Sequence, residues 1–387
     1  MKSAKTILSL LLIVLPIFGF IGCDSTSNRS GTDSATSVRE ESVPDTATIV
    51  FFGDAMQHGM QLERARELGS PSNPYNFDGC FELIAPAVKD ADYAVVNLEL
   101  PLGGGPDYSG YPMFSAPDSY AMALKNAGFD LFLTANNHCL DRKDAGLRRT
   151  LTVLDSLKVD HIGTYNDASE RGRLVPFIKE INGIKVGFLN YTYGTNGMTA
   201  GSGAEVSYIN REKIKNEIEA TRKAGAEIIV AMPHWGVEYV LNENDEQRSL
   251  ADFMLKQGVD IIIGGHPHVV QPMRVITDSD SGKKSLVVYS LGNFISNMTA
   301  RNTRGGAFVR VVIERDAEGN ARFKNAEYDT FITETPTGEN TNFRVVPRWA
   351  VHLLPESQKD NWSQHDRAVT ELYTQYNIEV PRSGKSY

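Results

Sequence analysis

The sequence has little cysteine, no long basic run and no apolar stretch of comfortable membrane-spanning length. Three cysteines among 387 residues exclude a small disulfide-rich scaffold. No run of Lys and Arg exceeds two residues and the net charge is -9, which argues against nonspecific binding to nucleic acid or anionic lipid. With 41% hydrophobic residues, the chain can still bury one large core or two smaller ones.

The N-terminal 45 residues are predicted to be a leader and a tether. An apolar stretch at 7–21 follows two lysines and ends at Gly22-Cys23. It is short for a membrane span, and its end resembles a bacterial lipobox. We therefore expect a lipoprotein signal peptide at 1–22, with a plain secretory peptide or an uncleaved anchor as alternatives. Residues 23–45 are rich in Ser, Thr, Asp and Glu and lack aromatics, which predicts a disordered tether.

This leader predicts a lipid-anchored protein of the cell envelope that contacts the membrane through lipidated Cys23. Two further cysteines, Cys80 and Cys139, lie beyond the tether, and the sequence does not decide whether they are joined. Cys139 follows His138, but adjacent side chains on a loop often diverge. A thiol nucleophile is therefore the weaker interpretation.

The remaining chain alternates strand and helix signals, which predicts an α/β domain over 46–345. The economical interpretation is two packed sheets, or one large sheet, with helices outside. Helices are expected at residues 119–127, 144–157, 211–224 and 245–257, three of them followed by a glycine stop. Residues 346–387 are predicted to be a C-terminal extension packed on the same domain, with one helix at 366–376.

Six short apolar runs end on polar residues that suit metal ligands. Such runs are typical of strands buried on both faces, and ligands gather at the carboxyl ends of parallel strands. The residues at these ends are Asp54, Glu99, Asn136, Asn137, His138, His234, His266, His268 and Asn293. We therefore expect them to meet at one rim of the fold.

These residue types favour a site for two divalent cations. Imidazole nitrogen mixed with carboxylate and amide oxygen suits Mn, Fe or Zn better than Ca. Two such cations bind a phosphoryl group and activate a water. His138 is the predicted acid, with Asp141 as the carboxylate that orients it. Trp235, Glu238 and Tyr239 follow His234 and are candidates for substrate contact or for packing.

The motifs also carry a family resemblance over residues 46 to 300. The ordered set Gly-Asp-x-Met, Asn-Leu-Glu-x-Pro-Leu, Ala-Asn-Asn-His-x-x-Asp, His-Trp-Gly-x-Glu-Tyr, Gly-x-His-Pro-His and Ser-Leu-Gly-Asn-Phe resembles the bacterial capsule-synthesis CapA family. That family is associated with poly-γ-glutamate capsules and resembles the calcineurin-like metallophosphoesterases. The resemblance implies a β-sandwich of two mixed sheets flanked by helices.

The resemblance also implies a role for each matching position. Asp54 corresponds to the first metal ligand, Glu99 to a bridging carboxylate and Asn137 to an amide ligand. His234 and His266 correspond to ligands of one metal and His268 to a ligand of the other. His138 corresponds to the acid that protonates the leaving group. Asn136 and Asn293 are expected around these ligands.

The first motif departs from the wider superfamily pattern, which has Asp-x-His. Here Asp54-Ala55-Met56 replaces it, and His58 lies too far along to be carried over. Glu99 also replaces an Asp. The sequence therefore leaves two functions open: a metal-dependent, phosphoesterase-like hydrolase, or a noncatalytic accessory component that binds capsule polymer or export proteins.

Overall fold

The computed structural model describes residues 46–201, 203–338, 341–376 and 379–387. The predicted signal peptide and tether lie outside the described residues. Within those ranges, no helix combines the length and the apolar character needed to cross a membrane.

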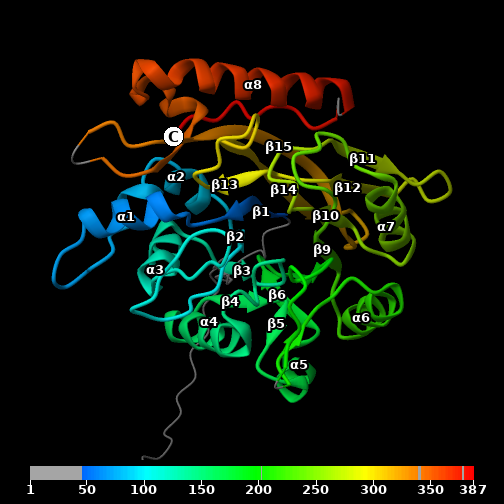
Figure 1. The fold of residues 1–387 in the computed structure, drawn as a ribbon. Coiled ribbons are helices and arrows are strands. Elements are labelled where there is room, and N and C mark those ends of the chain that lie inside the picture. The colour runs from blue at the N-terminus through cyan, green and yellow to red at the C-terminus, as the bar shows by residue number, and fades with distance from the viewer. Residues whose placement is uncertain (1–45, 202, 339–340, 377–378) are drawn as a thin grey trace, which may run out of the picture. The chain divides into compact units, whose positions relative to one another are not determined.

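The described chain alternates strands and helices for most of its length (Figure 1). The helices are α1 (Gly59–Glu67), α2 (Ala85–Lys89), α3 (Asp118–Ala127), α4 (Lys143–Leu157), α5 (Ala168–Leu174), α6 (Arg211–Lys223), α7 (Asp245–Lys256) and α8 (Glu356–Tyr376), with 3₁₀ turns η1 (Asp78–Cys80) and η2 (Arg348–Leu353).

The strands form two large sheets and one small pair. They are β1 (Thr46–Ala55), β2 (Tyr93–Leu98), β3 (Leu131–Leu133), β4 (Asp160–Ile162), β5 (Thr164–Tyr165), β6 (Phe177–Ile181), β7 (Ile184–Thr192), β8 (Glu205–Val206), β9 (Ile228–His234), β10 (Ile261–Ile263), β11 (Met273–Thr277), β12 (Lys284–Val288), β13 (Asn293–Ile295), β14 (Gly305–Arg315), β15 (Ala321–Glu334) and β16 (Arg344–Pro347).

Both large sheets are mixed. The first has the order β16-β15-β14-β1-β2-β3-β4, with β13 also paired to β1; β1 to β4 are mutually parallel and β14 to β16 antiparallel. The second has the order β11-β12-β10-β9-β7-β6, with four parallel central strands. The strand runs that end on predicted ligands are thus divided between the two sheets.

Alternation along the strands buries both faces of each sheet. In β1, Ile49 and Phe51 belong to the cluster between the sheets, whereas Val50 and Phe52 pack toward α2, α3 and α4. The second sheet shares the inner cluster and covers its other face with α6 and α7. This four-layer arrangement confirms the predicted sandwich of two mixed sheets flanked by helices.

The boundaries show two differences from the predicted elements. The helix expected at residues 366–376 begins ten residues earlier, at Glu356, because Trp362 and His365 extend its buried face N-terminally. The last apolar run ends at Val288 in β12, and the chain then crosses to the first sheet, where Asn293 opens β13 beside β1.

Helix α8 lies along β15 (Figure 1). Tyr373 packs edge-on against Tyr328 with ring centroids 4.6 Å apart. Near the start of the helix, Trp362 joins a small apolar cluster with Ile332 and Val346. These contacts cover the antiparallel part of the first sheet.

Replacing Phe51 by alanine should destabilise the fold by about 3–5 kcal/mol, because a large side chain buried between the sheets leaves a cavity. Phe51 is 1% exposed. Urea unfolding of the full chain measures the change. Met60→Ala is the control, since that side chain is 63% exposed and should change stability by no more than about 0.5 kcal/mol. Equal effects of the two substitutions would contradict the assigned core.

Candidate metal centre

Polar side chains from both sheets converge where the parallel strands end. Asp54 lies in β1, Glu99 directly follows β2, and His234 ends β9. The predicted residues Asn137, His266 and His268 come from loops that follow β3 and β10. All six are buried, and Asp54 and Glu99 have no exposed surface. Buried carboxylates require compensating charge or hydrogen bonds, so the contacts among these groups determine what the cluster can bind.

Asn97 lies at the centre of the cluster. Its Nδ2 donates to Oδ1 of Asp54 at 2.8 Å and lies 3.4 Å from Oε2 of Glu99. Asn136 supports this arrangement, because its Nδ2 donates to Oδ1 of Asn97 and to the carbonyl of Leu98. The two amides therefore fix where both carboxylates point.

His234 and Asn137 face each other across the two sheets. Nε2 of His234 lies 2.8 Å from Oδ1 of Asn137 and 3.5 Å from Oε1 of Glu99. An imidazole nitrogen, an amide oxygen and a carboxylate oxygen thus converge at one place. These are the donor types that borderline divalent cations accept.

The His266-Pro267-His268 loop is held in an unusual backbone conformation. His266 has φ 98° and His268 has φ 58°, a left-handed region that costs energy in residues other than glycine. The backbone N–H of His266 donates to Oδ2 of Asp54. A Cβ at Gly265 would lie 2.8 Å from Oδ1 of Asp54, so glycine permits this close approach. The turn brings two histidines separated by one residue into a single site.

Asp54 and His268 shift each other's pKa in opposite directions. Burial opposes the ionisation of Asp54, but the close approach of His268, whose Nδ1 lies 3.6 Å from Oδ2, and the charges of His234 and His268 outweigh burial and hold the Asp54 pKa well below its usual range. Burial likewise opposes a charge on His268, but Glu99 and Asp54 raise its pKa to about 9. The metal-free site therefore holds a proton on His268 at neutral pH.

Glu99 and His266 have the opposite tendency. Burial, followed by repulsion from Asp54, raises the pKa of Glu99. Burial, followed by the charges of His234 and His268, lowers the pKa of His266 far below its usual value. Burial thus favours the neutral form of each group. A divalent cation would supply positive charge beside Glu99 and would need the neutral imidazole of His266.

The donor set fits divalent cations. Oε1 of Glu99 and Nδ1 of His266 are buried without a hydrogen-bond partner among the described residues, which is costly unless a ligand satisfies them. Two compact groups share Glu99, one with Asp54 and His234 and the other with His266 and His268. The resemblance paired His234 with His266 instead. Both groupings give Glu99 a bridging position.

His138 lies at the edge of the cluster with its orientation fixed. Its Nδ1 is 2.8 Å from Oδ2 of Asp141, which also accepts the backbone N–H of Phe114. The ring of Phe114 packs edge-on against that of His138 at 4.7 Å. Because Nδ1 carries the proton shared with Asp141, Nε2 is the nitrogen left for proton transfer.

The other predicted residues are placed in different surroundings. Oδ1 of Asn293 lies 2.9 Å from Nδ1 of His268, within hydrogen-bond distance. Trp235 is buried in the core beside α7, where its Nε1 donates to the carbonyl of Tyr289. Tyr239 is half exposed with its ring 6.2 Å from His268, and the charge of Glu238 acts on His268. Asn293 thus contacts the candidate metal ligand His268. Trp235 packs in the hydrophobic core, whereas Glu238 and Tyr239 are partly exposed to solvent.

Two residues of the site were missed by the sequence prediction. Asn97 precedes Glu99 by two positions, so strand alternation places both on one face, a signal that was available. Tyr193 follows the end of β7 and its ring lies 4.5 Å from that of His266. Because β7 runs parallel to β9, its carboxyl end reaches the same rim.

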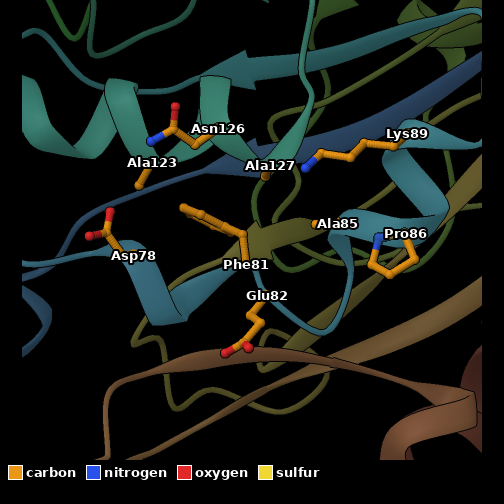
Figure 2. Close-up of a pocket in the computed structure, with 9 residues that line it drawn as sticks. All are labelled: Asp78, Phe81, Glu82, Ala85, Pro86, Lys89, Ala123, Asn126 and Ala127. Carbon is orange, nitrogen blue, oxygen red and sulfur yellow. The ribbon is translucent and has the colours of Figure 1, made fainter.

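A separate hollow lies away from this centre. It has a volume of about 450 Å³ and lies between η1, α2 and α3, with Phe81 at its floor and Asp78, Glu82 and Lys89 around it (Figure 2). It contains none of the predicted site residues. The space beside Asp54, Asn97 and His234 is far smaller, about 20 Å³.

The fold and this cluster define an α/β sandwich with a candidate two-cation centre at the ends of its parallel strands. Residues 48–298 match the family described as bacterial capsule synthesis protein PGA_cap. The chain belongs to this family, and the predicted resemblance is confirmed.

Curated relatives agree with the family match. The chain is 28% identical over 331 residues to the PGA biosynthesis protein CapA of Bacillus subtilis (strain 168), covering 84% of this chain and 82% of the relative. It is 28% identical over 323 residues to the capsule biosynthesis protein CapA of Bacillus anthracis, covering 80% and 74%.

Solved structures match at lower similarity. The NAD nucleotidase NadN of Haemophilus influenzae matches with 13% identity and a TM-score of 0.45, over 86% of this chain and 60% of its own. The calcineurin-like phosphoesterase YfkN of Bacillus subtilis matches with 14% identity and a TM-score of 0.40, over 74% and 90%. The described chain thus spans about three fifths of the nucleotidase's length.

The raised pKa of His268 predicts how the metal-free protein responds to pH. Charged His268 stabilises the fold fully below its unfolded pKa of 6.5, and that contribution is lost as the pH rises through about 9. Between these values, the free energy of unfolding of the chelator-treated wild type should fall more steeply than that of His268→Gln. Urea unfolding at several pH values measures both slopes.

The control is His352→Gln, because His352 is exposed in η2. This variant should keep the wild-type slope. Equal slopes for His268→Gln and the wild type would mean that His268 does not hold the raised pKa.

Proposed function

We propose that the chain is a metal-dependent hydrolase of the capsule-biosynthesis type that cleaves a phosphoester or a related bond. The observation that carries this proposal is the pair of compact ligand groups sharing Glu99, next to a histidine oriented for proton transfer. A structural metal site needs neither a shared carboxylate nor an adjacent acid.

Asp54, Glu99 and His234 would hold one cation, and Glu99, His266 and His268 the other, with Asn137 contributing its amide oxygen beside His234. Mn, Fe or Zn suits this mixture of nitrogen and oxygen donors. When bound, such cations supply positive charge to a phosphoryl group and acidify a water.

The chain's own residues would bind and orient the substrate and move one proton. Asp141 accepts the Nδ1 proton of His138 and stabilises the imidazolium, so that Nε2 can donate a proton to the leaving oxygen. Tyr193 and Tyr239 are each about half exposed on the two sides of the histidine cluster. They would pack against the substrate and limit the access of water.

The cellular setting is part of the same proposal. The leader ending at Cys23 would anchor the protein by lipid in the cell envelope, where capsule polymer or export proteins are its expected partners. One observation favours an accessory role without catalysis. Met56, at the position of the superfamily histidine, is buried in the apolar cluster facing α3 and offers no ligand.

Replacing the predicted acid His138 should distinguish a catalytic role from a noncatalytic accessory role. With Mn²⁺ resupplied to metal-stripped protein, His138→Gln should lower kcat for an alkyl phosphate by about 10²–10⁴-fold, because its leaving alkoxide needs a proton. For an aryl phosphate, the same substitution should lower kcat much less, because the leaving phenolate is stable without a proton. Steady-state kinetics on both substrates measure the difference.

His352→Gln is the matched control and should keep wild-type kinetics on both substrates. Metal content per chain is measured for each protein, since His138 is not among the compact ligand groups. Absence of Mn²⁺-dependent turnover in the wild type would reject the hydrolase proposal and leave the accessory role.

A further inference from the structure

A second cavity lies beside α8, outside the segment that matches the family. Its volume is about 440 Å³, and its walls are the loop at residues 299–304 and one face of α8. The family match ends at residue 298, so it assigns none of the residues in these walls. Unlike the metal-ligand cluster, this cavity is open and has room for a ligand.

The cavity carries unpaired positive charge. Arg301, Arg304 and Arg367 line it, and Glu371 is the one carboxylate among the described residues of its wall. None of the three arginines forms an ion pair or a side-chain hydrogen bond within the described part of the chain. Three guanidinium groups and one carboxylate give the wall of this cavity an excess of positive charge, which a bound anion would neutralise. This excess is local, because the whole chain carries a net charge of -9.

A buried histidine adds a second, independent feature to the same wall. His365 lines the cavity and is 4% exposed. Its Nε2 lies 3.2 Å from the carbonyl oxygen of Gly306, which can only accept, so Nε2 carries the proton. Nδ1 is then an acceptor, and it has no partner among the described residues. An unsatisfied buried acceptor is costly, and because Nδ1 has almost no accessible surface, an N–H donor of a ligand would reach it only after the His365 ring turned toward the cavity.

The cavity loop is tied to the metal centre by hydrogen bonds. The carbonyl of Thr303 accepts from Nδ2 of Asn293 at 2.9 Å, and Oδ1 of the same Asn293 holds Nδ1 of His268. A ligand in the cavity would therefore bind next to a segment that is fixed to a candidate metal ligand.

We propose that this cavity is a binding site for a polycarboxylate chain that carries backbone amides. The guanidinium groups of Arg301, Arg304 and Arg367 bind successive carboxylates, because the planar guanidinium pairs with carboxylate in a bidentate geometry. Nδ1 of His365 would accept an amide N–H once its ring turns toward the cavity, since this atom is buried in the present structure. A γ-linked glutamate chain offers both groups in every unit. This choice of ligand rests on the proposed role in capsule biosynthesis, whereas the anion site itself does not depend on the metal centre being catalytic.

The test measures binding of a short, fluorescently labelled γ-linked glutamate oligomer to the metal-free full chain by anisotropy. The wild type should bind it, and added NaCl should weaken binding. The triple variant Arg301→Gln, Arg304→Gln and Arg367→Gln should bind at least about tenfold more weakly. Arg367→Gln alone, on the exposed side of α8, should cause a smaller loss in the same direction.

The matched control replaces Lys213, Lys223 and Lys256 by glutamine. These exposed lysines lie on α6 and α7, so the control removes the same three charges elsewhere, and it should keep wild-type affinity. An equal loss in the control, or none in the arginine variant, would overturn the proposal.

Two further probes distinguish the ligand class. Inorganic phosphate should compete only weakly with the oligomer, because it does not span several arginines. Vesicles of phosphatidylglycerol should not bind through these residues. Arginine-dependent binding of vesicles without binding of the oligomer would make the cavity a lipid contact and reject the polycarboxylate site. His138→Gln should bind the oligomer normally, so failure of the hydrolase proposal would leave this result unaffected.

Discussion

The centre of this protein depends on burying two carboxylates without leaving their charge uncompensated. Asp54 and Glu99 have no exposed surface, and an isolated buried carboxylate is too costly to persist. Amide donors from one sheet and imidazoles from the other surround these carboxylates and compensate their charge. That requirement is met where strand ends of both sheets bring Asn97, His234 and the two carboxylates together. The same requirement explains why His266 and His268 accept left-handed backbone angles, since an extended loop would not turn both rings toward the carboxylates.

Strand alternation and strand-end chemistry predicted that most of these side chains would lie together, because both follow from local rules. A strand buried on both faces has a continuous apolar run, and the first polar residue after it must lie at the rim. Asn293 departed from that rule, since its run ends at Val288 and the chain then changes sheets. Only the three-dimensional path reveals such a crossing. Tyr193 was missed for a similar reason: its place depends on which strands are neighbours.

The C-terminal region was less predictable. Helix α8 has a broad polar surface and buries few large side chains, among them Trp362 and Tyr373, so its periodicity is weak before its position on β15 is known. The cavity beside it could not be predicted at all. Arg301 and Arg367 are far apart in sequence, and nothing in the residues around them indicates a site. Only the structure shows that both line one cavity without ion-pair partners among the described residues.

Strand β13 connects the candidate metal centre to the loop that lines the cavity beside α8. It pairs with β1 in register, Asn293 beside Asp54, and Asn293 bonds both His268 and the cavity loop. A displacement of that loop must either stretch the bond to Thr303 or move the side chain that orients His268. Binding energies at two linked sites are reciprocal. If a ligand in the cavity shifted the loop enough to reorient His268, it would change the affinity of the centre for metal, and metal would then change the affinity for that ligand by the same factor.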